Sequence, residues 1–271
     1  MSDLLSMDRR IRPPLKWAGG KRWLVKQIEH LWKPYEKRNY RFVEPLCGGL
    51  AVTLGLMPRL ALLNDINSHL INFYLQLKRG LKADLPMRFD KGIYYDYRNR
   101  FNGLVKTGKW KTPEAALLFY YLNHSGYNGL CRFNQQGYFN VPVGEYKQVT
   151  YMKEFDQYRF AFDKWEFSCE DFEKLTVNAN DFVYVDPPYD VEFRQYSEAG
   201  FDWKDQVRLA KWIAERTDHR VPVVISNQAT ERIVKLYSDM GFKLEFLDAP
   251  RMISCKGDRT RAKEVLATKG I

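Results

Sequence analysis

One tetrapeptide combines residue types that could orient a reacting amine: Asp186-Pro187-Pro188-Tyr189, which directly follows the apolar run Phe182-Val183-Tyr184-Val185. Two acceptors that bind both N–H groups of an exocyclic amine localise its lone pair on nitrogen, which makes the amine more nucleophilic. Asp186 and the Pro187 carbonyl could be these acceptors, the prolines would fix the backbone between them, and Tyr189 could stack on a base. Ligands of open α/β sheets bind at the carboxyl ends of strands, so the position suits a functional site. The alternative is a rigid strand-to-loop turn with an incidental aspartate.

A second strand-to-turn segment could hold a nucleotide-like ligand. The run Phe42-Val43-Glu44-Pro45-Leu46-Cys47-Gly48-Gly49 predicts a strand that ends in a glycine turn, where the backbone can approach a ligand closely. Asp65 follows the next predicted strand, about 20 residues after the turn, which is typical of an acid that binds ribose hydroxyls. The alternatives are a tight turn without a ligand and, for Asn64 or Asp65, a helix N-cap before Ser68.

Near the N-terminus, Trp17 and Lys21 flank a Gly-Gly turn ahead of a predicted helix. The Lys21 ammonium could pair with a ligand carboxylate while Trp17 covers an apolar part of the ligand. Both side chains could instead be ordinary surface and core residues.

The elements that must position these residues alternate between strands and helices, which predicts an α/β fold with a parallel sheet covered on both faces. The predicted strands are Phe42-Val43, Leu60–Leu63, Phe182–Val185 and Val221–Ser226, and the predicted helices are Trp23–Trp32, Ser68–Leu77, Lys204–Ala214 and Glu231–Met240. The alternation stops between about Lys78 and Tyr151, where the chain becomes basic and rich in Tyr and Asn, with many turn residues from Asn123 to Gly144. This stretch is predicted to be a smaller insertion.

Charge favours an anionic partner. The 271 residues carry 43 Lys and Arg against 33 Asp and Glu, a net charge of +10. The excess is segregated, because residues 78–132 hold 11 basic and 4 acidic side chains whereas residues 133–240 hold 13 and 19. Such segregation suits nucleic acid. Four dispersed cysteines without a CxxC pair support neither a disulfide framework nor a structural zinc site, and no metal is expected.

The chain is predicted to be a soluble, cytoplasmic protein. Hydrophobic residues make up 45% of the sequence, enough to build a core, and no Pro/Gly/Ser tract or fixed-period repeat interrupts it. No apolar run comes near the roughly 20 residues that span a bilayer, and the start is charged rather than signal-like.

Taken together and in order, these segments resemble the Dam-type family of DNA adenine-N6 methyltransferases over nearly the whole chain. The resemblance implies S-adenosylmethionine as methyl donor and duplex DNA as partner of a monomeric enzyme. It also implies a Rossmann-like methyltransferase sheet of about seven strands, one of them reversed, with helices on both faces. Residues 1–77 and 150–271 would form the catalytic domain, and residues 78–149 an inserted, mainly helical DNA-recognition domain with a hairpin. The segments that carry the resemblance are Lys16–Lys21, Phe42–Gly49, Asn64–Asn67, Asp186–Tyr189, Ile225–Asn227, Arg251–Ser254 and Lys263–Leu266.

The resemblance assigns roles to residues of the catalytic domain. Trp17 and Lys21 would line the methionine end of S-adenosylmethionine, and Asp65 would bind its ribose. Asp171 and Phe172, in the short match Glu170-Asp171-Phe172, would contact its adenine. Asp186 would face the reacting centre, with Pro187 and Tyr189 completing the catalytic set.

Residues 122–144 are similar to the family's DNA-reading hairpin. Arg132 would contact a guanine, whose O6 and N7 accept a bidentate guanidinium. Tyr127 and Asn128 would fill the space left by a flipped adenine, and Leu130 would contact a thymine methyl. Members with this hairpin commonly target GATC, which is the expected target here. An ordinary turn-rich hairpin with a structural aromatic is the alternative.

One segment departs from the family pattern. Dam-type enzymes usually carry a longer loop with an aromatic-rich tip after the tetrapeptide, whereas this chain has only residues 190–201, in which Phe193 and Tyr196 would replace the missing contacts. Two other functions remain open: cytosine-N4 methylation, which uses the same amine chemistry, and a non-catalytic DNA-binding regulator that retained the fold. Asp at position 186 and the motif order argue against the first, and the intact tetrapeptide argues against the second.

Overall fold

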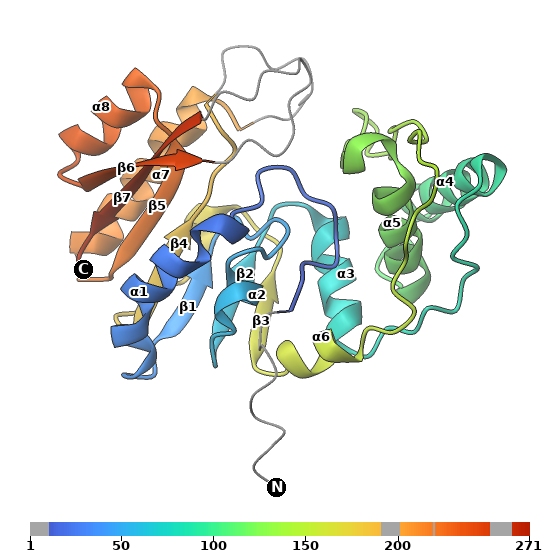
Figure 1. The fold of residues 1–271 in the computed structure, drawn as a ribbon, viewed down its shortest axis with the longest axis horizontal. Helices are drawn as coiled ribbons and strands as arrows, with labels where there is room; N and C mark the ends of the chain where they lie inside the picture. The colour runs from blue at the N-terminus through green and yellow to red at the C-terminus, as the bar shows by residue number, and fades with distance from the viewer. Residues whose placement is uncertain (1–10, 191–200, 219, 250–261) are drawn as a thin grey trace, which may run out of the picture.

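The computed structural model describes residues 11–190, 201–218, 220–249 and 262–271 (Figure 1). Two expectations lie outside the described residues: the contacts of Phe193 and Tyr196, and the motif Arg251-Met252-Ile253-Ser254.

Within the described residues, seven strands form one mixed sheet in the order β3-β2-β1-β4-β5-β7-β6. The first five strands of this order pair in parallel, and β7 is antiparallel to both β5 and β6. The single reversed strand confirms the expected Rossmann-like sheet. The strands are β1 (Arg41–Glu44), β2 (Ala61–Asn64), β3 (Trp165–Ser168), β4 (Asp181–Val185), β5 (Val223–Gln228), β6 (Lys243–Ala249) and β7 (Ala262–Lys269).

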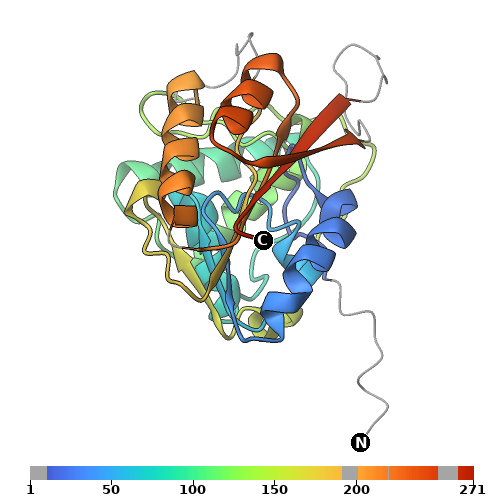
Figure 2. The ribbon, with the colours of Figure 1, turned by 90° about the vertical axis from the view of Figure 1, so that its left-hand side faces the viewer.

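Helices cover both faces of the sheet because buried strand residues alternate between two cores. Phe42 of β1 belongs to the core under α1 and α3, whereas its neighbour Val43 belongs to the core under α7 and α8. Figure 2 shows α1 and α7 on opposite sides of the sheet. The helices are α1 (Val25–Glu36), α2 (Thr53–Leu56), α3 (Ser68–Lys78), α4 (Lys91–Lys106), α5 (Pro113–Ser125), α6 (Asp156–Ala161), α7 (Trp203–Asp218) and α8 (Glu231–Asp239).

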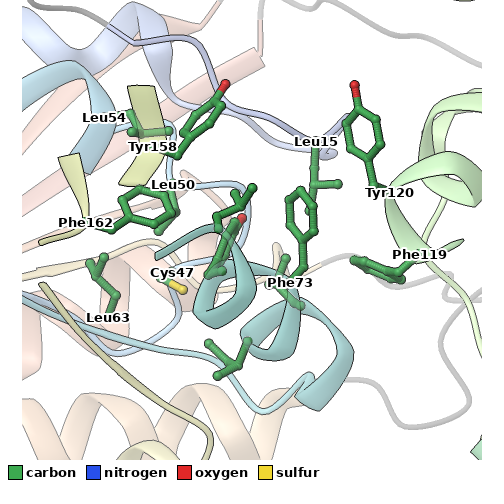
Figure 3. Packing of buried hydrophobic residues seen from close by; sticks show 14 of the residues in the cluster. Leu15, Cys47, Leu50, Leu54, Leu63, Phe73, Phe119, Tyr120, Tyr158 and Phe162 are labelled. Atoms are coloured by element: carbon green, nitrogen blue, oxygen red, sulfur yellow. The ribbon is translucent and has the colours of Figure 1, made fainter. Parts of the chain in front are cut away.

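Residues 78–149 contribute none of the seven strands and hold α4 and α5, which lie beyond α3 in Figure 1. Thr112 caps α5 by accepting a hydrogen bond from the Ala115 amide at 3.2 Å, and nearly every side chain of this helix is buried. Phe119 and Tyr120 of α5 join the same core as Phe73 of α3 (Figure 3). The turn-rich stretch after α5 forms two isolated bridges, Gly126 with Val143 and Phe133 with Phe139, instead of a continuous ladder.

The ring of His69 in α3 packs against aromatic side chains of residues 78–149. The ring stacks on Phe133 with centroids 4.9 Å apart and meets Phe101 and Trp110 edge-on. Burial among these apolar rings lowers the pKa of His69 to about 4. The neutral imidazole is therefore the form that the folded protein accommodates.

This environment predicts an acid-dependent loss of stability. The unfolded imidazole titrates near 6.5 and the folded one near 4, so the unfolded chain binds more protons as the pH falls through this window. Between pH 7 and pH 5 the free energy of unfolding should fall by about 2 kcal/mol on account of His69 alone. Urea titrations at the two pH values should show this fall in the parent and in a control, His30→Phe on α1, but not in His69→Phe. An equal fall in all three proteins would contradict the prediction.

Candidate functional site

Four chain segments meet at the carboxyl edge of the sheet, because the parallel strands β1, β2, β4 and β5 all end on this side. Glu44 ends β1, Asp65 follows β2, Asp186 follows β4 and Ser226 lies near the end of β5. Between β1 and β4 the order of connection changes direction, which is where open α/β sheets bind ligands.

The ammonium of Lys21 lies at the centre of a polar cluster at this edge. Lys21 Nζ lies 2.9 Å from Asp186 Oδ1 and donates a 2.9 Å hydrogen bond to the Tyr189 hydroxyl. The Ser226 hydroxyl donates to the same Asp186 oxygen at 2.9 Å, and Ser226 is itself hydrogen-bonded to Tyr184. The sequence placed Lys21 in a different motif from Asp186 and Tyr189, and the fold brings the lysine into direct contact with both.

The cluster is shielded from water, which strengthens its electrostatic interactions. Lys21 is 2% exposed, whereas the Asp186 side chain keeps 25% of its surface open. Burial acts to lower the pKa of Lys21, but Asp186, Tyr189 and Glu264 together raise it above its usual value. Burial raises the pKa of Asp186, and Lys21 and Ser226 only partly oppose this effect.

The proline turn after β4 is fixed from the side of α7. Gln206 of α7 donates from its side-chain nitrogen to the Pro188 carbonyl at 2.8 Å, and its amide oxygen accepts from Asn227 at 3.1 Å. Asn227 also donates to the Tyr237 hydroxyl of α8. The backbone that carries Asp186 is therefore held by a buried hydrogen-bond chain between two helices.

The glycine turn after β1 packs against Trp17 and Asp65. The Gly48 amide donates to Asp65 Oδ2 at 3.0 Å, and the Asn67 amide donates to the other carboxylate oxygen at 2.9 Å. Gly48 has a φ of +43°, and an added Cβ would lie 2.6 Å from Trp17 Nε1. Only glycine fits this approach of backbone to indole.

Asn64 and Asp65 have roles other than the helix N-cap that the sequence left open for them. Asn67 caps α3, because its side chain accepts from the His69 and Leu70 amides. The Asn64 side chain donates to the carbonyls of Pro45 and Glu170 and accepts from the Glu170 amide, which joins the ends of β1, β2 and β3. Burial raises the pKa of Asp65.

Asp171 and Phe172 lie apart from the Lys21 cluster, in the turn after β3. The Asp171 carboxylate accepts from the Glu173 amide and from Arg208 of α7, and these hydrogen bonds lower its pKa although burial acts in the opposite direction. The Phe172 ring is 4% exposed and packs in the core under α7. Arg208 lies over this ring, 5.0 Å from its centroid.

A family model described as D12 class N6 adenine-specific DNA methyltransferase matches residues 17–253. The chain belongs to this family of adenine-specific DNA methyltransferases. The match runs from Trp17 through the glycine turn and the tetrapeptide, so it includes most of the cluster described above.

Curated relatives of this methyltransferase have the same kind of name. The chain is 35% identical to the DNA adenine methylase of Vibrio cholerae, with 96% of each chain covered. It is 33% identical to the type II methyltransferase M1.LlaDCHI of Lactococcus lactis subsp. cremoris, with 95% of each covered. It is also 35% identical to the DNA N-6-adenine-methyltransferase of Escherichia phage P1, where 96% of this chain spans 36% of the phage protein. Among the described residues, no helix is long and apolar enough to cross a membrane.

Three side chains of the methyltransferase's polar cluster were not identified from the sequence as functional: Ser226, Glu264 and Glu44. Ser226 and Glu264 lay in motifs that supported the resemblance, but no role followed from them. Glu44 ends β1 and is 4% exposed, and burial raises its pKa to about 8. A charged side chain at the end of a buried, apolar strand is the signal that could have identified it.

The four predicted DNA-contacting residues of the methyltransferase lie on the bridged stretch after α5. Tyr127 is 48% exposed, and Asn128 next to it has a φ of +51°, in the left-handed region. Arg132 Nε donates to Asn140 Oδ1 at 2.8 Å, which fixes the guanidinium. Leu130 is half-buried and packs against the core under α1 and α3.

The last turn of α5, just before the bridged stretch, is attached to the N-terminal segment that carries Trp17 and Lys21. The Asn123 side chain accepts from the Lys16 amide at 2.8 Å and donates to the Lys16 carbonyl at 2.9 Å, as a neighbouring strand would. Lys16 Nζ donates to the His124 carbonyl at 2.7 Å. Asn67, two residues after Asp65, donates to Cys131 Sγ at 3.4 Å. Hydrogen bonds between three residue pairs therefore join the candidate ligand site to the predicted DNA-reading stretch, residues 122–144.

Proposed function

We propose that this methyltransferase transfers the methyl group of S-adenosylmethionine to N6 of an adenine flipped out of duplex DNA, within GATC. The observation that carries the proposal is the cluster of Lys21, Asp186 and Tyr189 at the carboxyl edge of the sheet, beside the glycine turn. The enzyme would act as a monomer in the cytoplasm.

The residues at the strand ends fit this methyl donor. Lys21 would pair with its carboxylate, Trp17 would cover its methionine end and Asp65 would bind its ribose, while the Asp171-Phe172 turn would contact its adenine. Glu44 Oε2 is buried, and no described residue donates a hydrogen bond to it, so a cationic amine would supply the missing donor. When bound, S-adenosylmethionine supplies a sulfonium that makes its methyl group electrophilic.

The tetrapeptide would prepare the amine for attack. Asp186 and the Pro187 carbonyl accept the two N–H groups of adenine N6, which concentrates the lone pair on nitrogen, and Tyr189 stacks on the base. Methylated N6 must then lose one proton, and the Asp186 carboxylate is placed to accept it. Burial raises the pKa of this carboxyl, which makes it a better proton acceptor than an exposed aspartate.

Residues 78–149 would form the target-recognition domain. In this role Arg132 contacts guanine, Leu130 contacts the thymine methyl, and Tyr127 and Asn128 fill the space that the flipped adenine leaves. The exposed Tyr127 ring and the fixed Arg132 guanidinium suit these tasks.

Restriction digestion of DNA from cells that express the protein tests the target. Such DNA should resist an endonuclease that adenine methylation at GATC blocks, and an endonuclease that requires this methylation should cut it. If digestion is unchanged but the hydrolysed DNA contains N6-methyladenine, the GATC target is rejected and the adenine methylation activity is not. Unchanged digestion without N6-methyladenine would reject the proposed activity.

Charge reversal in the proposed recognition domain tests the DNA-binding surface. Lys106, Lys109 and Lys111 are exposed at the end of α4 and in the loop after it. Changing Lys109 to Glu should weaken DNA binding several-fold and reduce the slope of log Kd against log salt by about 1, while the Kd for S-adenosylmethionine stays the same. The matched control is Lys37→Glu, an exposed lysine between α1 and β1 at the opposite edge of the sheet. Equal effects of both substitutions on DNA binding would contradict the proposed surface.

A further inference from the structure

Glu264 reaches the catalytic edge because β7 is the reversed strand. Glu264 pairs in register with Gln228, the last residue of β5, so the beginning of β7 lies beside the carboxyl ends of the parallel strands. Its side chain is 3% exposed. The Tyr189 hydroxyl donates to Glu264 Oε1, and Lys21 Nζ lies 3.6 Å from the same oxygen.

Two carboxylates thus share one ammonium inside the protein. Lys21 is 2.9 Å from Asp186 and 3.6 Å from Glu264, with the Tyr189 hydroxyl hydrogen-bonded to both Lys21 and Glu264. Glu264 Oε2 is buried, and none of the residues that the structure describes donates to it. A buried carboxylate with an unsatisfied oxygen costs stability, so packing alone does not account for Glu264.

We propose that Glu264 is a positioning residue for methyl transfer: it holds Lys21 and the Tyr189 hydroxyl at the back of the pocket and thereby keeps Asp186 available to the target amine. This inference rests on the roles proposed above for Lys21, Asp186 and Tyr189. Without the Glu264 charge, Asp186 would be the one carboxylate among the described residues that still pairs with the Lys21 ammonium. A fully paired Asp186 is a poorer acceptor for the amine and a weaker base.

The same competition predicts an effect on pH dependence. Removing the Glu264 charge leaves more of the Lys21 attraction to Asp186, which lowers the pH at which Asp186 becomes protonated. The ionisable and charged groups that act on Asp186 or lie beside it come from several elements: Lys21, Glu44, Tyr184, Tyr189, Tyr237 and Glu264. Only Glu264 is changed in the test.

Steady-state kinetics of Glu264→Gln, which keeps an oxygen that accepts from Tyr189, tests the proposal. We expect kcat to fall about 30- to 100-fold, because a misplacement on the order of 1 Å costs about 100-fold. The KM for S-adenosylmethionine should change little, and the acid limb of the kcat–pH profile should move to lower pH. Glu245→Gln, the same substitution at an exposed position on the adjacent strand β6, is the matched control and should behave like the parent.

Glu264→Asp separates charge from packing. It keeps a carboxylate but shortens the side chain, so kcat should fall while the acid limb stays at the parent position. An unchanged kcat and acid limb in Glu264→Gln would overturn the proposal. So would a lower kcat with an unchanged acid limb and a lower melting temperature, which would indicate a structural role. If the parent protein itself transferred no methyl group, the proposed function would fail instead.

Discussion

The Asp186→Ala protein is expected to remain folded and to lose at least about 1000-fold in kcat for adenine methylation. One preorganised hydrogen bond to a reacting group is worth about 100- to 1000-fold, and Asp186 also receives the N6 proton in the proposed mechanism. Lys21 keeps Glu264 and Tyr189 as partners after the substitution, so its charge is not left unpaired. Single-turnover measurements with saturating DNA and methyl donor report the chemical step directly.

The other end of the same strand supplies the control. Asp181 begins β4 and is paired with Arg41, with 2.9 Å between Asp181 Oδ1 and Arg41 Nε and between Asp181 Oδ2 and Arg41 Nη2. Asp181 is 2% exposed, so Asp181→Ala should lower the free energy of unfolding by about 3 to 5 kcal/mol. Its kcat below the melting transition should stay near the parent value. Near-parental turnover in Asp186→Ala would reject the catalytic role, whatever the result for Asp181.

The second large effect is expected from Arg132→Ala on a GATC duplex. Asn140 fixes the guanidinium through its side-chain and backbone oxygens, so the bidentate contact to guanine would require little ordering on binding. Loss of such a contact costs about 1 to 3 kcal/mol, which corresponds to a fall in kcat/KM of about 5- to 150-fold. Arg159→Ala, at an exposed position on α6, should leave kcat/KM unchanged.

A modified base shows whether guanine is the partner. Replacing guanine by 7-deazaguanine removes the N7 acceptor, so the parent enzyme and Arg159→Ala should lose kcat/KM on this duplex. Arg132→Ala has already lost the contact and should methylate both duplexes equally well. Equal sensitivity to 7-deazaguanine in all three proteins would contradict the assignment of Arg132.

The central strands and their helices could be predicted from local sequence. Phe182 to Val185 is buried on both faces, so an apolar run marks β4 within one residue of its observed bounds. The edge strand β6 exposes Phe246 to solvent and carries charges along its length, so it lacks this signal. The run Ala262–Lys269 consists largely of good helix formers, and its pairing with β5 and β6 makes it a strand.

In the site, too, local sequence identifies some residues, whereas others come together only through the fold. Asp186 and Tyr189 could be identified because the acid, the prolines and the ring follow one another in the chain. Glu264 lies 75 residues after Tyr189, and only the reversal of β7 brings it to the same hydroxyl. The attachment of Asn123 to Lys16 spans 107 residues and uses backbone groups of Lys16, which leave no pattern in the sequence.

In the proposed mechanism, Asp186 directs methyl transfer to adenine N6 in duplex DNA. Incubation of the purified protein with plasmid DNA and isotopically labelled S-adenosylmethionine, followed by nucleoside analysis, tests it most directly. We expect label in N6-methyladenine for the parent and for Asp181→Ala, and none above background for Asp186→Ala. Label in N4-methylcytosine, or equal label in N6-methyladenine from Asp186→Ala and the parent, would contradict it.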